Sequence, residues 1–184
     1  GVWRQILALS AAAMTARQVG RSEDEAALRD AVLLTRPGDD VGPGGRLVLG
    51  WQLLATRPAG ELLKRQNLKS TLEQFGYRHD DDTVAALYDE TRHLAQISGF
   101  SESLTNAYTI SQRHNLGPVF AAFIADSLLA QRLGWAHAVP LLGGENLPQQ
   151  RGRKAANHHA PADDGEQDQQ QIKRLLVAQA RAAL

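Results

Sequence analysis

The sequence contains no cysteine and carries no net charge. Without thiols the chain cannot form disulfides, thiolate metal sites or a cysteine nucleophile, which is compatible with a reducing compartment. Lys+Arg and Asp+Glu both total 20, so no overall field attracts nucleic acid or an anionic membrane. No apolar run approaches the roughly 20 residues that cross a bilayer. We therefore expect a cytoplasmic protein whose binding sites, if any, are local.

Aromatic residues are scarce, at 5% of the chain, whereas hydrophobic residues reach 43% and are mainly alanine and leucine. This composition favours helices over sheets. Apolar residues recur at helical spacing, and capping and stop signals separate the segments. The pattern predicts an all-α fold, an irregular bundle of about seven short helices. Ser22 is the predicted N-cap of the second helix, and the third is predicted to begin near Arg46.

The chain divides into three predicted parts. Residues 1–142 carry the helical patterns of one domain, with an extended hydrophobic segment at 135–142. Residues 143–170 are rich in Gly, Pro, Gln, Asn, His and charge, so we expect a mobile or disordered linker. Residues 171–184 resume helical spacing and predict a C-terminal helix that packs on the domain or on a partner. Because that helix lacks a cap and the chain starts at Gly1, we expect a longer parent protein.

Residues 36–46 contain two prolines and four glycines, which predicts an irregular loop. Its backbone N–H groups and Arg46 could bind a phosphate, and Asp39 and Asp40 could bind a hard cation. The alternative is a tight connection between helices, in which the aspartates cap local N–H groups and pair with arginines. No Lys-Ser/Thr follows the glycines, so the Walker pattern is absent. We favour the connection.

Asp126 interrupts the most hydrophobic predicted helix. At 100° per residue it falls among apolar positions, so we expect it to be at least half buried. An ion pair with Arg46, Arg36 or Arg132 would organise the core around it. A catalytic or ligand-facing carboxylate with a raised pKa is the alternative. Because neither a second carboxylate nor a histidine is placed beside it, we favour the ion pair.

The other candidate motifs are incomplete. Glu90 and His93 form one Glu-x-x-His pair, whereas helical di-iron proteins use two with further glutamates. The basic cluster at 151–154 could contact nucleic acid, but the acidic residues at 163–166 cancel most of its field. No Gly-x-Ser-x-Gly elbow or Gly-x-Gly-x-x-Gly loop occurs. We therefore expect no metal, no cofactor and no catalysis.

Four segments together resemble a bacterial family catalogued as domain of unknown function family 1403, found mainly in α-proteobacteria. These are residues 28–31, the loop at 36–46, Trp51, and residues 125–135. The resemblance covers most of 1–142 and resumes in the last predicted helix. It implies no activity, cofactor or catalytic residue. It singles out the 36–46 loop and Asp126, which is most simply explained if the two are partners.

The sequence favours a helical association module without catalysis, which binds itself or another bacterial protein. The segment at 135–142 and the last predicted helix are the expected contact surfaces. One alternative is a phosphate- or nucleotide-binding protein that uses the 36–46 loop. Another is a weak nucleic-acid binder that uses the 151–154 cluster.

Overall fold

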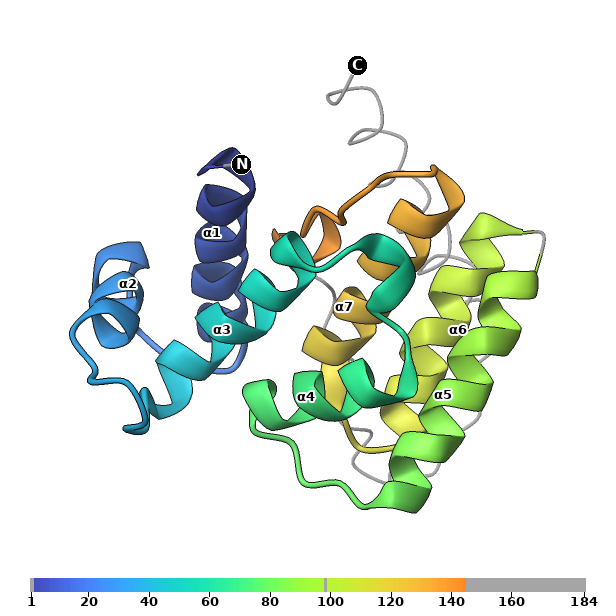
Figure 1. Ribbon diagram of the computed structural model, residues 1–184, viewed down its shortest axis with the longest axis horizontal. Helices are drawn as coiled ribbons and strands as arrows, with labels where there is room; N and C mark the ends of the chain where they lie inside the picture. The colour runs from blue at the N-terminus through green and yellow to red at the C-terminus, as the bar shows by residue number, and fades with distance from the viewer. Residues whose placement is uncertain (1, 98, 145–184) are drawn as a thin grey trace, which may run out of the picture.

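The computed structural model describes residues 2–97 and 99–144 (Figure 1). Seven α-helices and two short 3-10 helices make up this part of the chain, and its β-structure is limited to one isolated bridge between Pro58 and His137. The predicted all-α, irregular bundle is confirmed. The elements are α1 (Val2–Gln18), α2 (Glu25–Leu33), α3 (Gly42–Thr56), η1 (Ala59–Glu61), α4 (Arg65–Phe75), α5 (Asp81–Gln96), α6 (Phe100–Arg113), α7 (Gly117–Arg132) and η2 (Leu142–Gly144).

Helix α3 joins the two sides of the bundle (Figure 1). It packs against α1 and α2 on one side and against α4 on the other. On the second side α4, α5, α6 and α7 pack in succession, α4 on α5, α5 on α6 and α6 on α7. The short η2 contacts both α1 and α7, so the end of the described chain closes back on its beginning.

Helix α7 supplies the centre of the core. It is buried on nearly every side, which explains why its sequence lacks a polar stripe. Around it lies a cluster of aromatic rings whose neighbouring centroids are 5.8 to 6.5 Å apart, mostly edge-to-face or tilted. The cluster contains Trp51, Phe75, Tyr77, Phe120 and Phe123. Half of the ten aromatic residues therefore lie where α3, α4 and α7 meet.

Two predicted helix starts are wrong. The N-cap of α2 is Asp24 instead of Ser22, and its carboxylate accepts the N–H of Ala27 at 2.8 Å. Helix α3 begins at Gly42, inside the segment predicted to be irregular. A proline in the first helical turn loses no hydrogen bond, so Pro43 is compatible with that start. Gly44 packs closely against α2, because a Cβ on Gly44 would lie 2.9 Å from Leu28 Cδ2.

The short η2 includes residues 143 and 144, the first two of the predicted linker. Gly143 is buried in it. The rest of the predicted linker and the predicted helix at 171–184 lie outside the described residues. Among the described helices, none combines the length and the hydrophobicity that crossing a bilayer requires.

Candidate functional site

The loop at 36–46 forms a closed connection between α2 and α3. The Asp40 carboxylate accepts the N–H of Gly42 at 3.0 Å and pairs with Arg46 at 3.0 Å. The hydrogen bond from Arg46 lowers the pKa of Asp40 below its usual value. Asp40 therefore occupies the N-terminus of α3 and compensates the charge of Arg46. Asp39 and Arg36 are exposed, and the Asp39 N–H donates to the Arg36 carbonyl. This geometry is that of a capped connection.

Asp126 is buried, with 1% of its surface exposed, but its partners are not arginines. Its carboxylate accepts the backbone N–H of Leu142 at 3.0 and 3.2 Å and that of Gly143 at 3.3 Å. The expected pairs with Arg46 and Arg36 are not formed, because Arg46 pairs with Asp40 and Arg36 is exposed. Within residues 2–97 and 99–144, no cation forms an ion pair with Asp126. We name Asp126, Leu142 and Gly143 the Asp126 clamp.

Arg132, the third expected partner of Asp126, bonds to other groups. Its guanidinium donates to the carbonyls of Leu94 and Ile97 and, at 2.7 Å, to Ser103 Oγ. These carbonyls end α5, where backbone oxygens lack helical donors. Arg132 therefore joins the end of α7 to the turn between α5 and α6.

Burial dominates the electrostatics of Asp126. Loss of solvent raises the pKa of Asp126 to about 8, while the N–H bonds from Leu142 and Gly143 oppose the rise. The rise favours the neutral, protonated acid. A neutral carboxyl can still accept both N–H groups, and it avoids placing an unpaired charge in the core.

The Asp126 clamp continues into a buried aromatic contact. Gly143 lies so close to Trp51 that a Cβ on Gly143 would be 2.2 Å from Trp51 Cη2. The indole N–H of Trp51 donates to Thr15 Oγ1 at 3.0 Å. Polar and aromatic contacts thus run from α7 through η2 and α3 to α1. They hold residues 142–143 in place.

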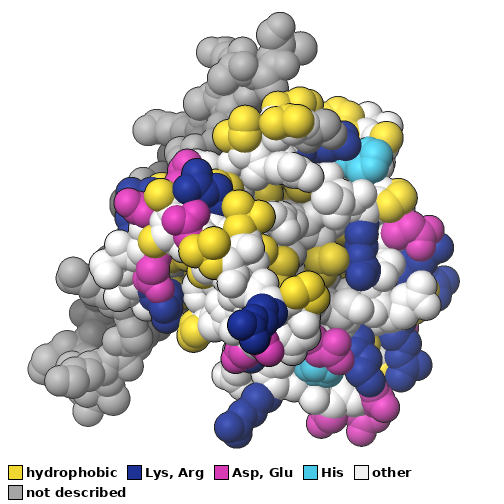
Figure 2. Space-filling model, turned by 60° about the vertical axis from the view of Figure 1, so that its left-hand side comes forward, with side chains coloured by type: hydrophobic (Ala, Val, Ile, Leu, Met, Phe, Trp, Pro, Cys, Tyr) yellow, Lys and Arg dark blue, Asp and Glu magenta, His cyan; other side chains and the backbone are white. Residues whose placement is uncertain are grey.

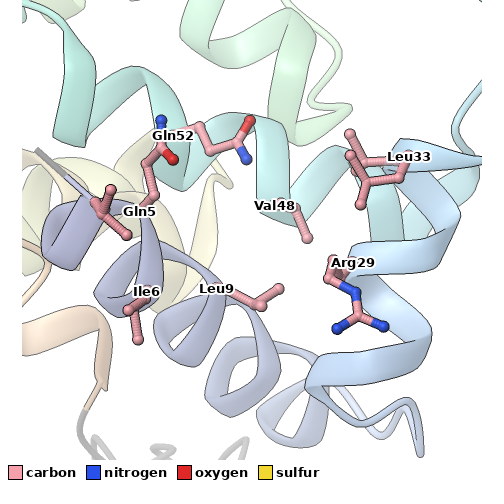
Figure 3. Close-up of a pocket in the computed structure, with 9 residues that line it drawn as sticks. Gln5, Ile6, Leu9, Arg29, Leu33, Val48 and Gln52 are labelled. Atoms are coloured by element: carbon pink, nitrogen blue, oxygen red, sulfur yellow. The ribbon is translucent and has the colours of Figure 1, made fainter.

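A groove lies between α1, α2 and α3, with a cavity of about 270 Å³ (Figure 3). Its apolar lining comprises Val2, Ile6, Leu9, Val32, Leu33 and Val48. Gln5 and Gln52 lie at one end of it, and Arg29 of α2 lies near the other (Figure 3). Figure 2 shows that hydrophobic side chains gather on this side of the molecule between charged ones. We name this feature the α1–α2–α3 groove.

A second hollow lies between the start of α1 and the segment that precedes η2, with a cavity of about 490 Å³. Its lining includes Trp3, Arg4, Leu7, Trp135, His137 and Leu141. We name it the tryptophan pocket. The expected contact segment at 135–142 forms one of its walls, which places that segment beside α1.

These two hollows were not predicted from the sequence. The signal was present in α1, whose buried face consists mainly of alanine, at Ala8, Ala11, Ala12 and Ala16. The larger residues Trp3 and Ile6 therefore remain at the surface.

In the structure, Glu90 and His93 do not form a common site. Glu90 contacts Arg113 at 3.0 Å and His114 at 3.4 Å, both at the end of α6, while His93 is exposed. In the part of the chain that the structure describes, no three His, Asp or Glu side chains cluster as metal ligands.

The chain belongs to a family described as protein of unknown function (DUF1403), whose model matches residues 1–184. No curated protein and no solved structure matches the chain. The family description names no activity.

Proposed function

We propose that this chain is a protein-association module, and that a second copy of the chain docks on the α1–α2–α3 groove. The observation that carries the proposal is the exposure of large apolar side chains around that groove. Ile6 is 59% exposed and Leu33 is 71% exposed. They come from two helices and line one continuous hollow, and contiguous apolar surface of this kind marks interaction sites.

The chemistry of the groove suits a copy of the same chain. The formal net charge is zero, so two copies do not repel each other. Beside the groove, Arg29 and Asp30 form an adjacent pair of opposite charges, at 2.9 Å. Gln5 and Gln52 each offer a donor and an acceptor. A two-fold interface brings one patch against itself, and such paired groups are self-complementary.

The alternatives have less support. In the 36–46 loop, Asp40 already occupies the helix N-terminus that a phosphate would need. The 151–154 cluster lies outside the described residues. A cytoplasmic location is part of the proposal and is supported by the absence of cysteine. Catalysis is not proposed, because the buried acid Asp126 is held by backbone N–H groups.

Light scattering coupled to size-exclusion chromatography over a concentration series tests the proposal. The unmodified chain should dimerise. Ile6→Glu and Leu33→Glu should each raise the dimer Kd by about 100-fold or more, because they would bury a carboxylate without a partner. Val19→Glu is the matched control, since Val19 is an exposed apolar residue just past α1 and does not line the groove. It should leave the dimer intact.

Circular dichroism should show that all three variants fold. A chain that is monomeric at every concentration would refute the proposal, as would a dimer that survives both groove substitutions. Deletion of residues 171–184 is a further test. If it abolishes the dimer although the groove is intact, the contact belongs to the C-terminal segment and the groove assignment is wrong.

A further inference from the structure

The tryptophan pocket lies along a different face of α1 from the groove and has a different chemistry. Its cavity of about 490 Å³ falls within the roughly 300–1,000 Å³ that is usual for small-molecule sites. Two indoles, from Trp3 and Trp135, are in its lining, together with aliphatic side chains. Arg4 and His137 are its only members with ionisable side chains. A mostly apolar hollow with a few polar groups is the usual form of a ligand site.

The segment at 135–142, which forms one wall of the pocket, is held by hydrogen bonds at both of its ends. At one end, the N–H of Ala59 donates to the carbonyl of Ala136 at 2.9 Å, and Gln131 Nε2 donates to the carbonyl of Ala59 at 2.9 Å. At the other end, Asp126 holds the N–H groups of Leu142 and Gly143. This wall of the pocket is therefore formed in advance, which lowers the entropy cost of binding.

Arg4 indicates which chemical group the pocket would bind. Its Nε is shielded from solvent and has no hydrogen-bond partner among the described residues. A shielded donor on a cation without an acceptor is unfavourable, and such groups in proteins normally have a partner. The guanidinium is suited to a carboxylate, which can accept two parallel N–H bonds from it. Arg4 is also one of the residues that line the apolar, indole-containing hollow.

We propose that the tryptophan pocket binds a small aromatic monocarboxylate. The carboxylate pairs with the Arg4 guanidinium, and the ring lies against the indoles of Trp3 and Trp135. The proposal does not depend on self-association, because the pocket and the α1–α2–α3 groove share no residue.

Isothermal titration calorimetry with 2-naphthoate tests the proposal, and 2-naphthamide is the matched uncharged ligand. One naphthoate should bind per chain, and naphthamide should bind at least about tenfold more weakly. Arg4→Gln should weaken the binding of naphthoate by a similar factor and leave the affinity for naphthamide unchanged. Arg4→Lys keeps the charge but loses the planar fork of the guanidinium. Its affinity for naphthoate should therefore lie between those of the parent and of Arg4→Gln. Trp135→Ala should weaken the binding of both ligands.

Arg36→Gln is the control, because Arg36 is exposed in the 36–46 loop and does not line the pocket. It should bind naphthoate as the unmodified chain does. Thermal melts confirm that each variant is folded. Equal affinity for the two ligands, an unchanged affinity in Arg4→Gln, or no naphthoate binding up to about 1 mM would each overturn the proposal. Binding by the Ile6→Glu variant should equal that of the parent, which separates this test from that of self-association.

Discussion

Asp40 and Asp126 both accept backbone N–H groups, yet they lie in opposite environments. The side chain of Asp40 is 63% exposed and pairs with Arg46, whereas Asp126 is enclosed by α7, η2 and the core. The pKa of Asp40 is lowered by the hydrogen bond from Arg46. That of Asp126 is raised to about 8 by burial. Two residues that sequence reasoning treated as possible members of one network are thus separate.

The difference shows where a carboxyl matters for stability. Water can replace either partner of an exposed ion pair, so such pairs contribute little. Water does not reach the Asp126 clamp, so the N–H groups of Leu142 and Gly143 depend on Asp126 as their acceptor. We therefore expect the clamp to be sensitive to substitution and the loop to be tolerant.

The largest effect is expected for Asp126→Ala. The substitution leaves two buried N–H donors without an acceptor, and each such donor costs roughly 1–3 kcal/mol. The free energy of unfolding should therefore fall by about 2–6 kcal/mol, measured by urea denaturation. Asp126→Asn keeps an acceptor oxygen of the same size and should lose clearly less. If Asp126→Ala is within ~0.5 kcal/mol of the parent, the clamp does not hold η2.

The free energy of unfolding should also depend on pH through Asp126. The change per pH unit should be smaller than the loss caused by Asp126→Ala. Between the ordinary pKa of 3.8 and the folded value of about 8, the unfolded carboxyl is ionised while the folded one keeps its proton. The folded state then binds one more proton, so the free energy of unfolding falls as pH rises, by about 1.4 kcal/mol per pH unit. This contribution is fully present below pH 3.8 and is lost as pH rises through about 8.

Urea denaturation of the parent and of Asp126→Asn at several pH values between 5 and 8 isolates this effect, since the other titrating groups are common to both. The stability of the parent should decline with pH relative to the variant. Parallel curves would mean that Asp126 is ionised in the fold, held by its N–H bonds.

The smallest effect is expected for Asp40→Asn. The substitution removes the ion pair with Arg46 and keeps an oxygen that can accept the N–H of Gly42. Because the pair is exposed, the thermal midpoint should not change measurably at physiological salt. A clear loss would show that the loop has a structural role comparable to that of the Asp126 clamp, and the contrast between the two regions would be lost.

Local signals account for much of the fold. Gly76 ends α4 in a left-handed conformation, and Asp80 caps α5 through the N–H of Thr83 at 2.7 Å. Such caps are readable because they depend on a few neighbouring residues. The start of α3 was missed for a non-local reason. Gly44 lies close to Leu28 of another helix, and a rule that treats glycine as a helix breaker does not detect such an approach.

The candidate sites were less predictable. The burial of Asp126 followed from its apolar neighbours in the chain, but its partners lie 16 and 17 residues away in η2, a segment with no polar side chain to reveal them. The tryptophan pocket unites residues 3 and 4 with 135 and 137. No periodicity connects positions that far apart.

The amino-acid sequence by itself determined the helical class, most helix ends and the burial of Asp126, because these depend on period, capping and local hydrophobicity. Only the tertiary structure decided which groups face each other: Arg46 toward Asp40, Asp126 toward Leu142 and Gly143, and Trp3 toward the pocket that Trp135 also lines. These pairings follow from how the helices pack, and packing depends on the shapes of surfaces that are distant in the chain.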